Sequence, residues 1–372
     1  MHLFIHVTHH NERTLNNLIR SLAEVDPARF DTPSILKRLV GASRELAELK
    51  GVVASIPNQQ ILISTLGIQE AKDSSAVENI VTTHDELFRE ASRLDTRGSP
   101  AAKEVLRYRQ ALQVGFERVR EHRLLSNNHI LEIQAVLEQN NAGFRQLPGT
   151  TLKDDAGRII YTPPQEGPEI ERLMGALEAF VNGEVPFDAD PLIRMALIHH
   201  QFESIHPFYD GNGRTGRIVN VLYLVKEGRL DIPVLYLSRF IVRTKSRYYQ
   251  LLQAVREEDA WEEWVLYMLQ AVEETAREAV ATVKAIHTAL LEVKHLVRKN
   301  HRKFYSQDLI NSLFMHPYTK VQFMEEELGV SRVTAMKYLN QLADGGILEK
   351  ARVGRTNLYM NIRLVSILAG VA

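Results

Sequence analysis

The sequence predicts a mainly α-helical protein with a short β-hairpin near its middle and a winged-helix domain at its carboxyl end. Apolar residues recur at spacings of three and four through most of the chain, which is the helical period. Two β-prone runs flank an Asp/Gly turn near residue 155. After residue 297 a glycine separates two short helical patterns, and a hairpin pattern follows them.

The composition is that of an ordinary globular protein and narrows the function mainly by exclusion. The 372 residues, 45% hydrophobic and 24% charged, suffice for two or three domains of roughly 150 residues each. A net charge of −1 gives no overall field that would select nucleic acid or a membrane. Cysteine is absent, which excludes disulfides and thiolate zinc sites and fits a reducing compartment. No apolar run approaches the roughly 20 residues that span a bilayer, and no signal-peptide pattern is seen. We therefore expect a cytoplasmic protein without membrane contact.

Helical patterns follow one another along the chain. They cover 33–50, 58–72, 84–140 with a break near 98–100, 168–182, 190–205, the stretch after 214, the stretch from 247, and a connector over 272–300.

Residues 206–217 read His-Pro-Phe-Tyr-Asp-Gly-Asn-Gly-Arg-Thr-Gly-Arg, and they predict a phosphate-binding loop. Glycine, asparagine and aspartate in the first half allow a tight turn with positive φ. An apolar helical pattern begins after Arg214, so the loop opens a helix. The first N–H groups of a helix have no internal acceptor and carry the positive end of its dipole. Because Gly211 and Gly213 have no Cβ, a phosphate can approach these amides closely.

Side chains of the same stretch supply the other parts of a transferase site. Arg214 and Arg217 lie three apart, on one side of the first helical turn, where both can bind phosphate oxygens. Asp210 beside an anion is costly unless a cation joins it, which indicates Mg²⁺ between carboxylate and phosphate. His206 is a titratable base a few residues away. A base, a metal carboxylate, an amide cradle and two arginines are what a phosphoryl or nucleotidyl transferase requires.

The stretch resembles the signature of the Fic (Fic/Doc) family, HxFx(D/E)GNGRxxR, at every fixed position. The resemblance implies a Fic-type helical core that transfers AMP from ATP to a Ser, Thr or Tyr hydroxyl of a target protein. It also implies that the loop formed by Gly211, Asn212 and Gly213 holds the ATP phosphates.

The resemblance assigns a role to each charged side chain as well. Asp210 would hold Mg²⁺ against the α- and β-phosphates. Arg214 would bind the β-phosphate and Arg217 the γ-phosphate. His206 would take the proton from the attacking hydroxyl.

One stretch ahead of the signature allows two interpretations. Ser75, followed three residues later by Glu78, is typical of a capping box at the start of a helix. Ser74 and Glu78 instead lie at i and i+4, on one helix face. With Asn79 they resemble the (S/T)xxxE(G/N) inhibitory motif of Fic proteins. The resemblance implies that Glu78 binds Arg217 and keeps the enzyme autoinhibited.

Two further features take a role from the resemblance. The hairpin predicted over 149–164 would be the flap above the active site, which aligns a target segment by strand addition. Tyr248 and Tyr249 open another helical pattern. They are either core residues or the pair that the family places against the adenine.

The carboxyl-terminal residues 297–372 carry eleven Lys and Arg against six Asp and Glu. Helical patterns at 321–328 and 332–343, with a glycine between them and a hairpin after them, predict a winged helix. Many winged helices join proteins, so DNA binding is the less favoured role. The second helix would expose residues suited to phosphate or base contacts, namely Ser331, Arg332, Thr334 and Lys337.

These features predict three regions and leave some alternatives open. The regions are an amino-terminal helical region over 1–110 with the inhibitory helix near 70–80, a Fic catalytic core over 111–290, and the winged-helix domain over 297–372. The same site could remove AMP or transfer another phosphate-containing moiety. Alternatively, the chain is a winged-helix regulator that responds to nucleotide. Self-modification and a homodimer also stay open.

Overall fold

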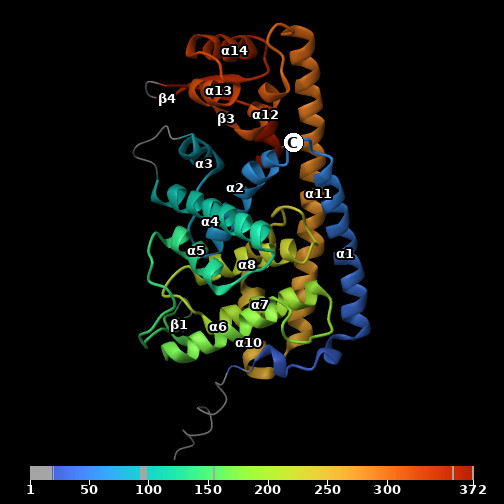
Figure 1. Ribbon diagram of the computed structural model, residues 1–372, viewed down its shortest axis with the longest axis vertical. Helices are drawn as coiled ribbons and strands as arrows, with labels where there is room; N and C mark the ends of the chain where they lie inside the picture. The colour runs from blue at the N-terminus through green and yellow to red at the C-terminus, as the bar shows by residue number, and fades with distance from the viewer. Residues whose placement is uncertain (1–18, 20, 93–98, 154–155, 354–355, 371–372) are drawn as a thin grey trace, which may run out of the picture.

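The computed structural model describes residues 19, 21–92, 99–153, 156–353 and 356–370. Helices dominate it, as the sequence predicts, and they stack along one long axis (Figure 1). The tips of the two predicted hairpins, at 154–155 and 354–355, lie outside the described residues. No described helix is both long enough and apolar enough to cross a membrane.

Two long helices form one side of the molecule. α1 (Pro33–Ala54) packs lengthwise against α11 (Trp261–Asn300) (Figure 1). α1 begins where Pro33 follows the N-cap Thr32, whose hydroxyl accepts the N–H of Ile35. α11 is one unbroken helix of 40 residues, about 60 Å long, and is therefore longer than the connector predicted over 272–300.

The centre of the fold is a pair of buried helices, α7 (Pro191–Ile205) and α8 (Asn212–Lys226). Every residue of α8 from Arg214 to Leu224 is buried, so this helix has no solvent face. The loop between α7 and α8 is the signature stretch, which is thus held from both ends by the core. The same part of the fold contains η1 (Leu22–Glu24), η2 (Pro27–Phe30), α6 (Gly167–Val181), α9 (Leu237–Arg243) and α10 (Lys245–Glu258), of which α6 packs against α7.

The helix that contains Ser74 and Ser75 corrects one interpretation of the sequence. α2 (Gln60–Val77) does not stop at residue 72, and it runs through Ser74 and Ser75 to a C-cap at Glu78. Glu78 therefore ends a helix, so the capping-box interpretation is wrong. Serine is a weak helix former, but both serines are buried, and tertiary contacts override propensity here.

A capping box does occur a few residues further on. Thr83 and Glu86 form it at the start of α3 (His84–Ala91). α4 (Pro100–His122) and α5 (Asn127–Glu138) then complete the amino-terminal half of the fold. The region predicted as 84–140 is helical with these breaks.

The predicted hairpin is present as a two-stranded antiparallel sheet. β1 (Leu152–Lys153) pairs with β2 (Ile159–Tyr161), and Leu152 lies opposite Tyr161. With the helical core it confirms the predicted fold class.

The carboxyl-terminal residues fold as a separate layer at one end of the molecule (Figure 1). Strand β5 (Thr356–Met360) lies between β3 (Tyr318–Thr319) and β4 (Glu349–Val353) in an antiparallel sheet. Helix, strand, two helices and a hairpin follow one another, which is the element order that the winged-helix prediction requires. The elements are α12 (Gln307–Met315), β3 (Tyr318–Thr319), α13 (Val321–Leu328), α14 (Arg332–Asp344), β4 (Glu349–Val353), β5 (Thr356–Met360) and α15 (Ile362–Ala369).

The winged-helix domain rests directly on the amino-terminal helices. Gln69 of α2 donates to the carbonyl of Leu368 at 2.5 Å. The hydroxyl of Ser92 donates to the carbonyl of Tyr318 at 3.2 Å, and Lys320 donates to the carbonyl of Ser92 at 2.8 Å. α11 therefore does not hold the domain apart from the core, as the connector prediction implied, because α2 and α3 supply a docking surface.

Candidate active site

The signature loop has the backbone geometry that its sequence predicts. Gly211 has φ of 79° and caps α8 without a side-chain hydrogen bond. Asn212 closes the loop with two hydrogen bonds. Its side-chain oxygen accepts a hydrogen bond from the N–H of Phe208 at 2.8 Å, and its side-chain amide donates to the Phe208 carbonyl at 2.7 Å. The Phe208 ring is fully buried and anchors the loop.

This geometry leaves a row of donors at the start of α8. The first intrahelical bond runs from the N–H of Thr215 to the carbonyl of Gly211. The N–H groups of Asn212, Gly213 and Arg214 thus have no acceptor within the described protein. Such a row at a helix N-terminus binds phosphate.

Arg217 is fully buried and held by the end of α2. Its Nε donates to the hydroxyl of Ser74 at 2.8 Å, and its Nη2 donates to the Ser74 carbonyl at 2.9 Å. The same Nη2 donates to Oε1 of Glu78 at 2.8 Å. Burial alone would raise the pKa of Glu78, but the charge and hydrogen bond of Arg217 bring it below its usual value. Glu78 is therefore an ionised partner of Arg217.

The Glu78 carboxylate also lies over the amide cradle. A Cβ built on Gly213 would stand 2.3 Å from Oε1 of Glu78, so this oxygen occupies the approach to the loop. Asn79 follows with φ of 63°, and its side-chain oxygen accepts a hydrogen bond from Lys245. Of the three residues that the sequence singled out, Ser74 and Glu78 thus meet at Arg217, whereas Asn79 bonds Lys245.

Arg214 has carboxylate partners that the sequence did not reveal. It pairs with Glu104 of α4 and, at 2.8 Å, with Glu138 at the end of α5. Burial is the largest effect on Glu138 and raises its pKa, while Arg214 opposes the rise. Glu138 crowds the loop as well, because a Cβ on Gly211 would lie 2.4 Å from its Oε1. Both signature arginines are therefore engaged by carboxylates.

His206 lies at the C-cap of α7, directly before the loop, with φ of 50°. Arg145 fixes this turn by donating to the carbonyls of His206 and Ile205 at 2.7 and 3.2 Å. Burial, together with the charges of Arg145 and Arg256, lowers the pKa of His206 to about 4. The imidazole is therefore neutral at pH 7 and able to accept a proton.

Asp210 is the predicted metal carboxylate, and its surroundings fit a substrate-borne ion. Its side chain is 79% exposed at the mouth of the loop and lies 3.8 Å from Arg214. Among the described residues, no three His, Asp or Glu side chains gather as a protein-only metal site. Mg²⁺ commonly binds one carboxylate and completes its shell with substrate phosphates and water. A single exposed carboxylate beside a phosphate cradle suits that arrangement.

The two tyrosines have different surroundings. Tyr248 is buried, and its hydroxyl bonds to Nε2 of His199 at 2.8 Å. Tyr249 is 40% exposed and its ring meets the Tyr248 ring edge-on. Tyr248 thus belongs to the core, and only Tyr249 presents a ring surface to the outside.

The hairpin is tied to α7 and α10. The hydroxyl of Tyr161 donates to the carbonyl of Ser204 at 2.8 Å, two residues before His206. The guanidinium of Arg256 lies 3.9 Å from the centre of the Tyr161 ring, and Gln253 donates to the carbonyl of Ile160. Strand β2 is therefore fixed beside the histidine.

Two buried carboxyl groups, those of Glu203 and Glu70, lie near Arg217. Burial raises the pKa of Glu203 to about 7 and that of Glu70 to about 8, although Arg217 lowers both. Glu70 accepts hydrogen bonds from Ser238 and Tyr108. Neither residue could be singled out from the sequence, because their neighbours come from distant helices.

The fold is a helical core in which a neutral histidine directly precedes a glycine loop and the open N-terminus of a buried helix. The chain matches three family models, described as Fic/DOC family N-terminal over residues 36–117, Fic/DOC family over 124–224, and protein adenylyltransferase SoFic-like, C-terminal domain, over 290–364. The chain belongs to the Fic/DOC family.

Curated relatives share parts of the chain. It is 28% identical to protein adenylyltransferase fic-1 of Caenorhabditis elegans over 170 residues, covering 43% of this chain and 31% of the relative. It is 29% identical to protein adenylyltransferase Fic of Drosophila virilis over 155 residues, or 36% and 31% of the two chains. The matched region thus spans about a third of the length of these relatives.

Solved structures share the fold. A Fic family protein of Desulfovibrio desulfuricans superposes with a TM-score of 0.56 at 21% identity, covering 88% of this chain and 96% of that one. Fic-1 of C. elegans gives a TM-score of 0.53 at 21% identity, with 69% and 76% coverage.

Proposed function

We propose that the chain is a protein adenylyltransferase that transfers AMP from ATP to a Ser, Thr or Tyr hydroxyl, and that Glu78 inhibits it. The observation that carries the proposal is the row of open N–H groups at the start of α8, faced by a neutral His206. A phosphate cradle with an adjacent base is suited to nucleotidyl transfer.

In the proposed complex the ATP phosphates lie over Gly211, Asn212 and Gly213. Arg214 and Arg217 would bind the β- and γ-phosphates once their carboxylate partners move away. Tyr249 would contact the adenine with Tyr248 as its support.

The reaction needs one bond to form and one to break. The target hydroxyl oxygen attacks the α-phosphorus, the bond from that phosphorus to the bridging oxygen breaks, and pyrophosphate leaves. His206 accepts the hydroxyl proton as the new bond forms. Asp210 would hold Mg²⁺, which supplies neutralising charge when bound with ATP. Charge neutralisation and positioning would provide most of the rate enhancement.

The proposed inhibition follows from the position of Glu78. Its carboxylate binds the guanidinium that the γ-phosphate would use, and it lies on the approach to the Gly213 amide. ATP would bind weakly or with a misplaced α-phosphate. Displacement of Glu78 would restore both contacts.

The target would meet the flap. Ile159 and Ile160 of β2 are exposed on a two-stranded sheet, which supports strand addition by an extended segment. For the winged-helix domain we propose a protein-contact role rather than DNA binding. α14 exposes Val333 and Met336 beside its basic residues, and apolar side chains suit a protein surface better than a phosphate backbone.

The proposal also assigns the domain boundaries and the cellular location of the protein. The predicted boundary at residue 110 falls inside α4, so we place the junction of the amino-terminal region and the core at the turn between α4 and α5. We assign the core up to about residue 290 and a winged-helix domain to residues 297–372. Absence of cysteine supports a cytoplasmic location.

The test is transfer of label from ATP labelled at the α- or the γ-phosphate. The Glu78→Gly protein, incubated with a cell lysate, should attach the α-label covalently to protein and leave the γ-label in pyrophosphate. Attachment of the γ-label would indicate phosphorylation instead. A protein that binds ATP without transferring either label would be a nucleotide-responsive regulator. His206→Ala is the matched inactive control.

A further inference from the structure

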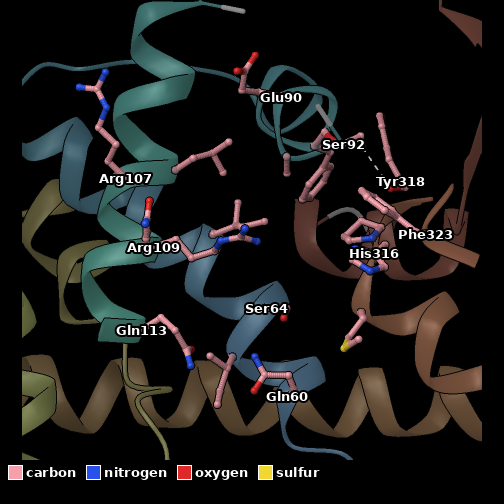
Figure 2. A pocket seen from close by; sticks show the side chains of 18 of the residues that line it. Gln60, Ser64, Glu90, Ser92, Arg107, Arg109, Gln113, His316, Tyr318 and Phe323 are labelled. Atoms are coloured by element: carbon pink, nitrogen blue, oxygen red, sulfur yellow. Dashed lines mark hydrogen bonds between the residues drawn. The ribbon is translucent and has the colours of Figure 1, made fainter. Parts of the chain in front are cut away.

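A pocket of about 740 Å³ lies between the helical core and the winged-helix domain. Helices α2 and α4 line one side, the end of α3 lies above, and the winged-helix domain closes the other side (Figure 2). None of the lining residues belongs to the signature loop. The volume is in the usual range for small-molecule sites.

Cations gather on the α4 side of this pocket. Lys103 and Arg107 lie at i and i+4, and Arg109 extends across α2 toward the centre (Figure 2). The stem of Arg109 crosses α2 at Gly67, where a Cβ would be 3.6 Å from its Cγ. At this distance even a Cβ would be in ordinary van der Waals contact, so the stem of Arg109 passes close along α2 on its way to the pocket.

Arg109 lacks a counter-charge. Within the described chain it has neither a hydrogen bond nor an ion pair, and burial lowers its pKa. An unpaired, partly desolvated guanidinium is costly, and a bound anion would remove that cost.

The opposite side of the pocket is aromatic. Phe88, Tyr318 and Phe323 line it, and the His316 ring stacks on Phe323 with ring centres 4.4 Å apart. Figure 2 shows His316, Tyr318 and Phe323 facing Arg109 and Gln113 across the space. Flat apolar rings opposite cations suit a ligand that is planar at one end and negative at the other.

We propose that this pocket binds a small planar anion, with a phosphate or carboxylate group on Arg109 and Lys103 and an aromatic ring system against Phe88 and Tyr318. This ligand site is separate from the proposed ATP site, because no residue of the signature loop lines the pocket. It would rest on α2, whose residue Ser64 lines the pocket and whose far end carries Glu78.

The probe is 8-anilinonaphthalene-1-sulfonate, which carries aromatic rings and a fixed negative charge and fluoresces when bound. N-phenyl-1-naphthylamine has the same rings without the sulfonate and serves as the neutral control. We expect one high-affinity anion site per full-length chain. Arg109→Gln should weaken it by at least about tenfold, as loss of a charged hydrogen bond does. Binding of the neutral analogue should not change.

Matched variants keep the test specific. Arg118→Gln makes the same change on an exposed part of α4, where the arginine binds Glu132, and should leave probe affinity unaltered. Lys103→Gln should weaken probe binding several-fold. It provides the test of the anion site if Arg109→Gln does not fold. Saturating ATP with Mg²⁺ should not displace the probe. Equal affinity in the wild type and the pocket variants, or displacement by ATP, would overturn the proposal.

Discussion

Replacement of Glu78 by glycine should produce a protein that is less stable and more active. Arg217 makes three polar contacts with the end of α2, and only one of them is to Glu78. The two contacts with Ser74 remain in the variant, so the guanidinium keeps its position. What it loses is the negative charge that competes with a phosphate.

The stability cost can be bounded from the geometry. Removal of one member of a fully buried ion pair costs about 3–5 kcal/mol. The Glu78 side chain is one-third exposed, at 33%, so water can reach the Arg217 guanidinium once the carboxylate is gone. Glu203 also lies near Arg217, and the raised pKa of about 7 lets it ionise there at neutral pH. We therefore expect a loss of about 1–3 kcal/mol in the free energy of unfolding.

The gain in activity should be at least about tenfold in AMP transfer, because misplacement of a reacting group by about 1 Å costs on the order of 10²-fold. Transfer is measured with α-labelled ATP, and stability by thermal unfolding of the same preparations. ATP at about 100 times its Kd should raise the free energy of unfolding of the variant by roughly 2.7 kcal/mol.

Two controls isolate the cause. Glu258→Gly makes the same change at the exposed end of α10 and should not activate the enzyme. Arg217→Ala combined with Glu78→Gly should cancel the gain, since the freed guanidinium is what the first change supplies. A Glu78→Gly protein that is destabilised and no more active than the wild type would refute the inhibitory role.

Three other changes test the catalytic loop and its surroundings. His206→Ala should lower transfer by about 10² to 10⁴ in rate while ATP still raises the melting temperature, because in the proposed mechanism the imidazole acts as the base and does not hold the phosphates. Near-normal turnover would remove His206 from that role. Gly213→Ala, made in the Glu78→Gly background, should raise the KM for ATP at least about tenfold, since its Cβ would lie where Glu78 Oε1 now lies and would also press on Arg217 Nη1 at 3.0 Å. An unchanged KM would place the phosphates elsewhere. Glu203 has a folded pKa of about 7, above its unfolded value, so the stability it contributes is present at low pH and is lost as pH rises through 7. Glu203→Gln should therefore flatten the decline in melting temperature between pH 5 and 8, and an unchanged slope would assign the decline to other groups.

Local chemistry explains what the sequence predicted well. The turn at Gly211 and the donors that follow depend on residues within one loop, and α8 follows from apolar spacing alone. The pairing of Glu78 with Arg217 was predicted from the resemblance of Ser74, Glu78 and Asn79 to a known motif, since the i+4 spacing alone does not identify a partner.

Long-range packing explains what the sequence missed. Glu104 and Glu138 reach Arg214 from two other helices, and nothing in their own neighbourhoods marks them. The end of α2 was misplaced because serine favours caps, whereas buried contacts keep Ser74 and Ser75 helical. The roles of Tyr248 and Tyr249 depend on the rotation of α10 against α7, which adjacent letters in a sequence do not reveal.

The order of α2 and α8 along the chain has a consequence during protein synthesis. Glu78 precedes Arg217 by 139 residues, so α2 leaves the ribosome roughly ten to thirty seconds before the loop is complete. The carboxyl-terminal residues that hold α2, such as Leu368, emerge later still. On the proposed mechanism, the catalytic loop therefore folds against an inhibitor that is already present. A newly made chain would never display an unrestrained active site to the other nascent proteins around it.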